Sequence, residues 1–331
     1  MNTSALLEVS GLTVSFTSHA DGPHAIDDIA FAVDRQRTLG LVGESGSGKT
    51  LSSLAILRLV PPPARIQAGR ITFDGQDLLA LNQAQMAALR GRRIAMVFQN
   101  PAYSLNPILS ISAQLAEILS WHEKLSRRAA RERVIEMLRL VGITDAPARA
   151  RQFPHELSGG MKQRICIARA LLCHPELILA DEPTTNLDVT IQAQILDLLQ
   201  EMKERFATSM ILVTHDMGVV ARMADRICVM YAGAICEEAD AMTIFRSPSH
   251  PYTRALLDSM PRADQSYSGV RSLPVIPGRI PNLAEPPSGC RFHPRCPEAG
   301  ADCQRFRPLP VMVSPGHVVS CLRRGSRPMQ L

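Results

Sequence analysis

The sequence predicts an α/β fold with a mainly parallel sheet, followed by a loop-rich tail. Short apolar runs of strand length alternate with amphipathic segments of helix length, which is the pattern of such a fold. Of the 331 residues, 46% are hydrophobic and 20% are charged, so the chain can bury a core. Prolines multiply from about residue 246, which indicates a tail with its own constraints.

The first hundred residues contain most of the expected strands. Short β-like runs separated by polar turns occupy residues 7–16, 27–33 and 38–43. From Thr50, apolar residues at helical spacing continue to the prolines at 61–63, which should end the helix. A strand–turn pattern follows at 69–79, and residues 92–101 read as a buried strand that ends in a loop.

The middle of the chain is predicted to be mostly helical. Residues 112 to about 155 are dense in helix formers and look like a helical insertion. Another helix runs from Gly160 to Cys173, and the short apolar strand "ELILADEP" follows it. The helix at 189–206 and the strand at 209–216 complete the alternation.

Composition excludes several classes of protein. The net charge of +5 is too small to argue for DNA binding, and 4% aromatic residues argue against stacking platforms for single-stranded nucleic acid. No apolar run reaches the roughly 18 residues that a membrane span needs. The first residues lack the pattern of a secretory signal. We therefore expect a soluble, cytoplasmic chain.

The segment "GESGSGKT", residues 43–50, fits the pattern G-x-x-x-x-G-K-[ST], and we call it the phosphate loop. It follows an apolar strand and opens a helix, as the pattern requires. Glycines let backbone N–H groups turn inward around phosphate oxygens, and the helix N-terminus adds its positive dipole end. Lys49 should reach the β- and γ-phosphates, and Thr50 should ligate Mg²⁺.

Two further segments carry chemistry. The strand "LILADE" delivers Asp181 to its end, where the carboxylate can hold Mg²⁺. Glu182 follows at the turn and can orient or deprotonate an attacking water. In "LSGGMKQR", Ser158 should cap a helix, and Gly159 and Gly160 should expose backbone donors as a second anion site.

With these motifs in order, the sequence resembles the ATP-binding cassette (ABC) ATPases over nearly the whole chain. The resemblance implies a P-loop NTPase (RecA-like) core with an ABC-specific antiparallel β region and a helical subdomain. It implies an ATPase domain over 1–245, a helical subdomain at about 101–165 and a C-terminal extension over 246–331. It also implies ATP and Mg²⁺ as cofactors.

The resemblance further implies a role for each matching residue. Glu182 would be catalytic, assisted by Gln99 of the Q-loop and the switch histidine His215. Thr50, Gln99 and Asp181 would hold Mg²⁺. Two cassettes would face each other head to tail, so that each signature segment, "LSGGM" at 157–161, serves the partner's nucleotide. The implied nucleotide-binding residues are Phe16 at the adenine, Gly43, Glu44, Ser45, Gly46, Ser47, Gly48, Lys49, Thr50, Ser158, Gly159, Gly160 and Asp188 of the D-loop.

Two residues depart from the family pattern. Asn186 stands where many relatives carry Ala, and Arg37 stands where a Glu usually precedes the strand. Asn186 could alter D-loop contacts across a dimer. Neither departure removes a catalytic group.

Longer stretches, such as "MVFQNPAYSLNP" and "DEPTTNLDVTIQAQIL", resemble the ATPases of bacterial oligopeptide, dipeptide and nickel importers. The tail resembles that subfamily's C-terminal extension. The resemblance implies a homo- or heterodimer of ATPase subunits under two membrane permeases, with an extracytoplasmic solute-binding protein delivering the substrate. It implies a peripheral position on the cytoplasmic face of the inner membrane and no nucleic-acid partner.

Four cysteines gather in the tail: Cys290, Cys296, Cys303 and Cys321. Disulfides do not suit a reducing cytosol, and the gaps are longer than those of most zinc sites. Four thiolates do suit a [4Fe–4S] cluster, and the subfamily resemblance favours one. Zinc and unligated thiols remain open.

Two other hypotheses remain open beside an importer ATPase. One is a soluble ABC ATPase that acts on nucleic acid or ribosomes. Such proteins tend to carry two cassettes in one chain or long coiled-coil insertions, and this sequence predicts neither. The other is a redox-sensing regulator, in which the cysteine cluster controls the ATPase. It is compatible with transport.

Overall fold

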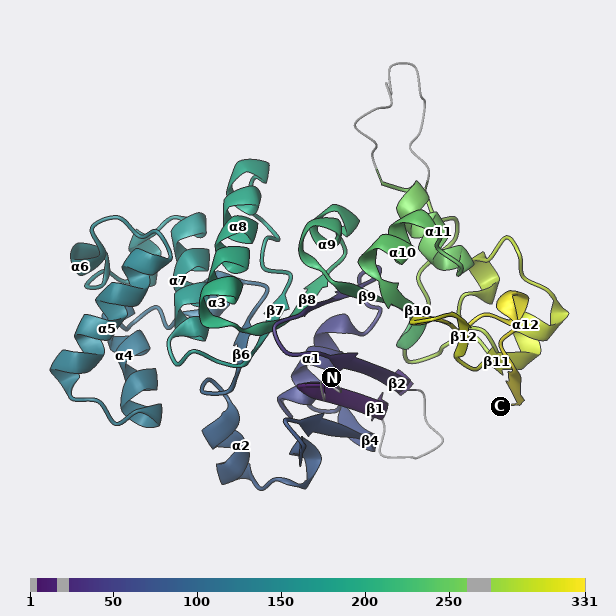
Figure 1. Cartoon of the computed structure of the whole chain (residues 1–331), viewed down its shortest axis with the longest axis horizontal. Coiled ribbons are helices and arrows are strands. Elements are labelled where there is room, and N and C mark those ends of the chain that lie inside the picture. Colours follow the sequence, from purple (N-terminus) through teal and green to yellow (C-terminus); the bar gives the residue numbers. More distant parts are fainter. Residues whose placement is uncertain (1–4, 17–23, 261–274, 331) are drawn as a thin grey trace, which may run out of the picture. The chain divides into compact units, whose positions relative to one another are not determined.

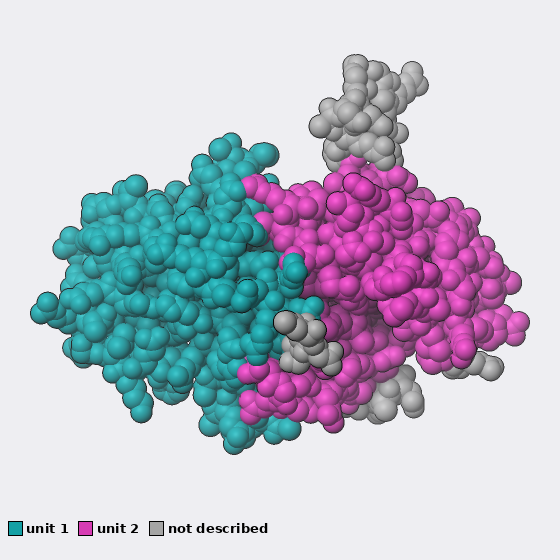
Figure 2. Space-filling model, in the orientation of Figure 1, with its two compact units in different colours: residues 1–6, 33–38, 80–213 teal, residues 7–32, 39–79, 214–331 magenta. Residues whose placement is uncertain are grey.

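The computed structural model describes residues 5–16, 24–260 and 275–330. These residues form two compact units, coloured separately in Figure 2. The first unit comprises residues 1–6, 33–38 and 80–213, and the second comprises residues 7–32, 39–79 and 214–331.

The first unit contains a parallel sheet of buried strands. Strand β7 (Leu177–Asp181) pairs in parallel with β6 (Ile94–Val97) on one side and β8 (Ser209–Thr214) on the other. Every residue of β7 and β8 is buried. Strands covered on both faces read as continuous apolar runs, which explains why the sequence showed no alternation there.

Helices make up most of the rest of the first unit (Figure 1). A serine begins three of them: Ser110, Ser126 and Ser158 each accept a hydrogen bond from the backbone N–H three residues later. The helices are α2 (Gln83–Leu89), α3 (Pro101–Ser104), α4 (Ile111–His122), α5 (Arg127–Leu140), α6 (Ala146–Arg149), α7 (Gly159–Leu171) and α8 (Val189–Phe206), with a 3₁₀ turn at Pro154–Glu156.

The second unit contains an antiparallel sheet with the order β2-β1-β4-β5 among the described residues. Figure 1 shows β1, β2 and β4 side by side. Asp74 and Gly75, both at positive φ, make the tight turn between β4 and β5. The strands are β1 (Leu7–Ser15), β2 (His24–Val33), β4 (Arg65–Phe73) and β5 (Gln76–Asp77).

A second set of strands in this unit supports the phosphate loop. Strand β3 (Thr38–Val42) pairs in parallel with β9 (Arg226–Tyr231), and β9 turns at Ala232 and Gly233 into antiparallel β10 (Ala234–Asp240). Beyond β10 lie β13 (His317–Val319) and β12 (Val311–Ser314), and β11 (Phe306–Pro308) pairs with β14 (Pro328–Gln330).

The helices of the second unit are short. They are α1 (Lys49–Ile56), α9 (Met217–Met223), α10 (Ala241–Arg246), α11 (Pro251–Asp258) and α12 (Ala301–Arg305), with 3₁₀ turns at Leu78–Ala80, His293–Arg295 and Leu322–Arg324. In the part of the chain that the structure describes, no helix is long and apolar enough to span a bilayer.

The structure confirms the α/β class and corrects two details. Helix α1 ends at Ile56 rather than at the prolines, because Arg58 adopts a left-handed φ of 53° and Leu59 N–H bonds back to Leu54. Helix α2 was not predicted, although Asn82 and Gln85 form a capping box at its start. The boundary at 245/246 stays a prediction, since residues 246–331 belong to the second unit together with β1–β4.

Three aromatic rings lie at the centre of the second unit's core. Tyr231 of β9, Tyr252 of α11 and Phe292 of the tail are almost fully buried. Their ring centroids lie 4.7 Å (Tyr231–Tyr252), 5.1 Å (Tyr231–Phe292) and 5.3 Å (Tyr252–Phe292) apart. The cluster packs the tail against the end of β9.

Candidate functional site

Glycines shape the phosphate loop between the buried strand β3 and helix α1. Gly43 has φ 153° and Gly48 has φ 102°. A Cβ on Gly43 would lie 2.1 Å from the carbonyl oxygen of Met230. No larger residue fits there, so the backbone can approach β9 closely only with glycine at this position.

The ammonium group of Lys49 lies against the backbone of this loop. Its Nζ donates to the carbonyl oxygens of Gly43 at 2.8 Å and Glu44 at 2.9 Å, and lies 3.3 Å from Ser47 Oγ. Lys49 is 5% exposed, whereas the next residue, Thr50, is exposed. A buried cation at the start of a helix is suited to binding an anion.

The two acids lie at the end of β7 in the first unit. Asp181 is buried, and Glu182 follows it with φ 44°. The Glu182 carboxylate accepts hydrogen bonds from Gln99 Nε2 and from Thr185 Oγ1, each at 2.8 Å. The structure therefore brings the predicted Gln99 and Glu182 into direct contact, and it adds Thr185.

The signature segment begins α7 as predicted. Ser158 Oγ accepts a hydrogen bond from Met161 N–H at 3.3 Å, and Ser158 and Gly159 are exposed. Within the same unit, Gln163 of α7 donates to the carbonyl oxygen of Pro183 at 2.6 Å. This bond ties the signature helix to the residue that follows Glu182.

The D-loop forms a tight turn before α8. Asp188 caps that helix by accepting from Ile191 N–H at 3.0 Å. Asn186 has φ 64°, a left-handed conformation that asparagine adopts more readily than most residues. Backbone conformation thus accounts for the asparagine where the family pattern has alanine.

The other predicted residues lie at strand ends. Phe16 follows β1 and is 38% exposed, and His215 is exposed directly after β8. Arg37 lies just before β3, and its carbonyl oxygen accepts from Met210 N–H at 2.9 Å. The roles predicted for Phe16 and His215 stay predictions.

The four tail cysteines are neighbours, but they do not form a metal site in this structure. Burial raises the pKa of Cys290 to about 12, and the thiols of Cys303, Cys321 and Cys296 add to the rise. Within the described ranges, no group of three or more His, Cys, Asp or Glu residues is arranged to hold a metal ion. The predicted iron–sulfur ligand set is therefore not assembled here.

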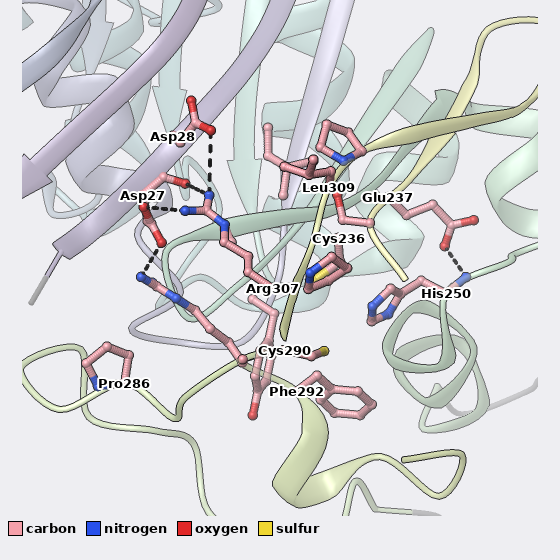
Figure 3. Close-up of a pocket in the computed structure, with 18 of the residues that line it drawn as sticks. Asp27, Asp28, Cys236, Glu237, His250, Pro286, Cys290, Phe292, Arg307 and Leu309 are labelled. Carbon is pink, nitrogen blue, oxygen red and sulfur yellow. Dashed lines mark hydrogen bonds and ion pairs between the residues drawn. The ribbon is translucent and has the colours of Figure 1, made fainter. Parts of the chain in front are cut away.

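A cavity of about 550 Å³ lies in the second unit between the tail and the β strands. Figure 3 shows Arg307 between Asp27 and Asp28, with Cys236 and Cys290 nearby. Arg307 Nη1 lies 2.8 Å from an Asp27 carboxylate oxygen, and Arg291 Nη2 lies 2.6 Å from the other. These ion pairs fasten the tail to β2.

Comparison with known proteins identifies the family. Residues 26–185 match the family described as ABC transporter, and residues 236–303 match the oligopeptide/dipeptide transporter C-terminal region. A protein of Sinorhizobium fredii, probable peptide ABC transporter ATP-binding protein y4tR, is 47% identical over 96% of this chain and 95% of its own. The chain belongs to the ABC transporter ATP-binding proteins.

Other similar proteins are also ATP-binding proteins of peptide transport. The dipeptide transport ATP-binding protein DppD of Bacillus subtilis is 46% identical over 97% of this chain and 96% of its own. Its oligopeptide counterpart OppD is 49% identical over 87% of this chain and 80% of its own. The tail match places this ABC protein in the oligopeptide/dipeptide subfamily.

Solved ABC cassettes share the fold. The cassette MJ0796, in a dimeric post-hydrolysis state bound to ADP and Pi, aligns with a TM-score of 0.62 at 26% identity, covering 71% of this chain and 98% of that one. The cbiO1 cassette of Clostridium perfringens also aligns with a TM-score of 0.62 at 26% identity, covering 73% of this chain and 91% of that one. This ABC protein is an ATPase with a P-loop NTPase fold, and its family implies ATP and Mg²⁺.

Sequence reasoning missed three residues of this ABC ATPase that contact predicted ones. Thr185 bonds Glu182, while Arg295 and Tyr252 both bond Glu44 of the phosphate loop. The threonine pair after "DEP" was a visible signal for Thr185. Arg295 and Tyr252 lie more than 200 positions from Glu44, so local patterns carried no signal for them.

Proposed function

We propose that this chain is the ATP-hydrolysing subunit of a bacterial importer for dipeptides, oligopeptides or a related small solute such as a nickel chelate. The observation that carries the proposal is the near full-length similarity to DppD, together with the match of the tail to the oligopeptide/dipeptide C-terminal region. A tail shared with peptide transporters is more specific than the cassette, which serves many transported substrates.

In this proposal, the phosphate loop binds the ATP phosphates through its backbone N–H groups and Lys49. Glu182 orients and deprotonates the attacking water, and Gln99 holds the carboxylate in place. Thr50, Gln99 and Asp181 supply the oxygen donors that Mg²⁺ prefers. The bound ion would neutralise phosphate charge.

We further propose that two ATPase subunits, identical or related, bind ATP between them. The exposed Ser158 and Gly159, with Gly160, would contact the γ-phosphate on the partner subunit, and Asp188 would lie at the subunit boundary. Phe16 would stack on adenine, and His215 would bond the γ-phosphate. The exposure of the signature segment supports this arrangement.

The permeases would dock on the first unit. Tyr103, Ile108 and Trp121 are 90%, 78% and 71% exposed, which is unusual for large apolar side chains. A hollow of about 420 Å³, lined partly by Leu109, Ile118 and Trp121, lies in the same unit. These features support a peripheral subunit held at the cytoplasmic face of the membrane by the two permeases, with the solute-binding protein acting from the other side.

Uptake measurements test the function. A labelled dipeptide should enter cells that express the chain with its permeases, and not cells that express Glu182→Gln.

A second experiment tests the docking to the permeases. Trp121→Ser should keep ATPase activity in solution and lose co-purification with membranes. Co-sedimentation with ribosomes instead of membranes would contradict the proposal and favour a soluble ABC ATPase.

We also propose a [4Fe–4S] cluster on Cys290, Cys296, Cys303 and Cys321, a finer prediction supported by the number of thiols in the tail and by the bond from Cys290 N–H to the Cys303 carbonyl oxygen at 2.8 Å. Because they are not arranged as a metal site here, binding would require side-chain movement. Anaerobic purification followed by iron and sulfide analysis tests it. For a [4Fe–4S] cluster, the expected result is four iron atoms and four sulfide ions per chain. Protein that contains no iron would refute the proposed cluster.

A further inference from the structure

Residues 290–296 of the tail reach the phosphate loop and the turn beside it, and we call them the clamp segment. Its side chains Arg291, Phe292 and Arg295 point to the second unit's strand β9 and to Glu44. Arg291 and Arg295 each lie next to one of the tail cysteines in sequence.

Arg295 makes the most direct of these contacts. Its Nη1 lies 2.6 Å from Glu44 Oε2 and its Nη2 lies 3.0 Å from Glu44 Oε1, which is a two-pronged pair. Further bonds to the carbonyl oxygens of Pro277 and Ile276 fix the guanidinium. The Arg295 side chain is 3% exposed, so water screens this ion pair weakly.

The backbone of Glu44 is held by the same cluster. Glu44 N–H donates to Tyr252 Oη at 2.9 Å, and the ring of Tyr252 packs on Phe292 of the clamp segment. Glu44 O in turn accepts from Lys49 Nζ. The tail therefore fixes the residue whose carbonyl oxygen positions the lysine of the phosphate loop.

A second contact supports the middle of the loop. Arg291 donates to the carbonyl oxygen of Ala232, at the turn between β9 and β10. The next residue, Gly233, donates its N–H to Ser47 O at 2.9 Å. Ser47 is the fifth residue of the phosphate loop, so the clamp segment supports the loop at two separate points.

The charge of Glu44 makes Arg295 more than a structural contact. A carboxylate within a loop that binds a polyanion would repel phosphate and would attract Lys49. The guanidinium of Arg295 compensates that charge and draws the side chain toward the tail. An arginine beside Cys296 thereby pairs with a negative charge that lies within the phosphate loop.

We propose that Arg295 is a positioning residue for ATP binding, which neutralises Glu44 and keeps the phosphate loop ready to accept anionic phosphate. The C-terminal extension would then set nucleotide affinity. This inference rests on the proposed function, because it assumes that residues 43–50 bind ATP.

Calorimetric titration of the full chain with Mg²⁺–ATP tests the inference. Arg295→Ala should weaken ATP binding about tenfold, and kcat at saturating ATP should fall much less. Glu44→Gln keeps the backbone N–H groups that would bind phosphate and removes the repelling charge, so it should bind ATP at least as tightly as the wild type. The double variant Glu44→Gln/Arg295→Ala should bind ATP nearly as well as the wild type.

The double variant separates this role from mere support of the fold. If Arg295 were only a structural tie, removing its partner as well would not restore affinity. Arg254→Ala is the matched control, because Arg254 pairs with Glu298 in the same tail and contacts no residue of the phosphate loop through that pair. It should leave ATP affinity unchanged.

Unaltered ATP affinity in folded Arg295→Ala would overturn the inference. If Arg295→Ala does not fold, the ATP affinity of Glu44→Gln is the deciding measurement. A tenfold loss of ATP affinity in Glu44→Gln would contradict charge neutralisation, whereas retained ATP affinity supports it. Lys49→Ala serves as the reference in the same titration. If Lys49→Ala binds ATP like the wild type, the proposed nucleotide site fails instead.

Discussion

The side-chain amide of Gln99 donates a hydrogen bond to the carboxylate of Glu182 at 2.8 Å. The two residues are 83 positions apart, at the ends of neighbouring parallel strands β6 and β7. Thr185 Oγ1 donates to the same oxygen, Oε2, at 2.8 Å. A carboxylate held by two donors has a fixed orientation, which a residue that directs a water requires.

Glu182→Gln should stop turnover and keep ATP bound. The amide has nearly the same shape but cannot take a proton, so we expect kcat to fall by a factor of about 10² to 10⁴. ATP-dependent dimers should accumulate and can be measured by size-exclusion chromatography. Glu201→Gln, at an exposed position of α8, is the control. Hydrolysis at the wild-type rate by Glu182→Gln would show that another group is the base.

Gln99→Ala and Thr185→Val should each lower kcat about three- to tenfold, because one donor to the Glu182 carboxylate remains in each. The double variant should lose more than the product of the two single effects, since the carboxylate then has neither of these bonds. Steady-state ATPase rates of the wild type, the two single variants and the double variant complete this double-mutant cycle. Multiplicative losses would show that the two residues do not act through Glu182 together.

The sequence was most informative where chemistry lies in short, local patterns. The phosphate loop, the acids after β7 and the serine that caps α7 were all predicted, since backbone geometry demands glycine, a strand end or a capping oxygen at those positions. Helix α8 has the predicted bounds, 189–206. These features depend on residues within a few positions of one another.

Prediction from the sequence failed where contacts join segments that are distant along the chain. The ion pair of Arg295 with Glu44 spans 251 positions, and no periodicity relates the two residues. The end of α1 was misplaced because the left-handed Arg58 gives no signal comparable to a proline. For the tail cysteines, spacing alone could not decide between a ligand set and separate thiols, because the fold of the tail determines which cysteines lie close together, as in the bond from Cys290 N–H to the Cys303 carbonyl oxygen.

Gly43→Ala should abolish ATP binding and lower the melting temperature. The added methyl group would lie 2.1 Å from the backbone oxygen of Met230, which cannot move without disturbing β9. Calorimetry with ATP and a thermal melt measure the two effects. Gly75→Ala is the matched control: Gly75 also has positive φ, 77°, but a Cβ added there would meet nothing within 4 Å, so we expect a loss of only about 1 kcal/mol. Normal ATP binding by Gly43→Ala would contradict the tight approach of the loop to β9.

Stability should fall with acid because of His250. Burial lowers the pKa of His250 from 6.5 to about 3, and its Nδ1 accepts the Tyr252 N–H at the start of α11. The unfolded chain takes up a proton below pH 6.5 while the folded chain does not, so this contribution is complete above pH 6.5 and is lost progressively toward pH 3. Between pH 7 and pH 5 the loss amounts to about 2 kcal/mol of unfolding free energy.

His250→Asn tests that assignment, because asparagine keeps an oxygen to cap α11 and does not titrate. Urea unfolding at pH 7 and pH 5 should show a smaller decrease for this variant than for the wild type. His155→Asn, at an exposed position, should behave like the wild type. An equal decrease in His250→Asn would mean that the acid sensitivity arises elsewhere and that the α11 start tolerates a charged imidazole. The start of α11 matters to the phosphate loop because Tyr252, two residues after His250, accepts the N–H of Glu44.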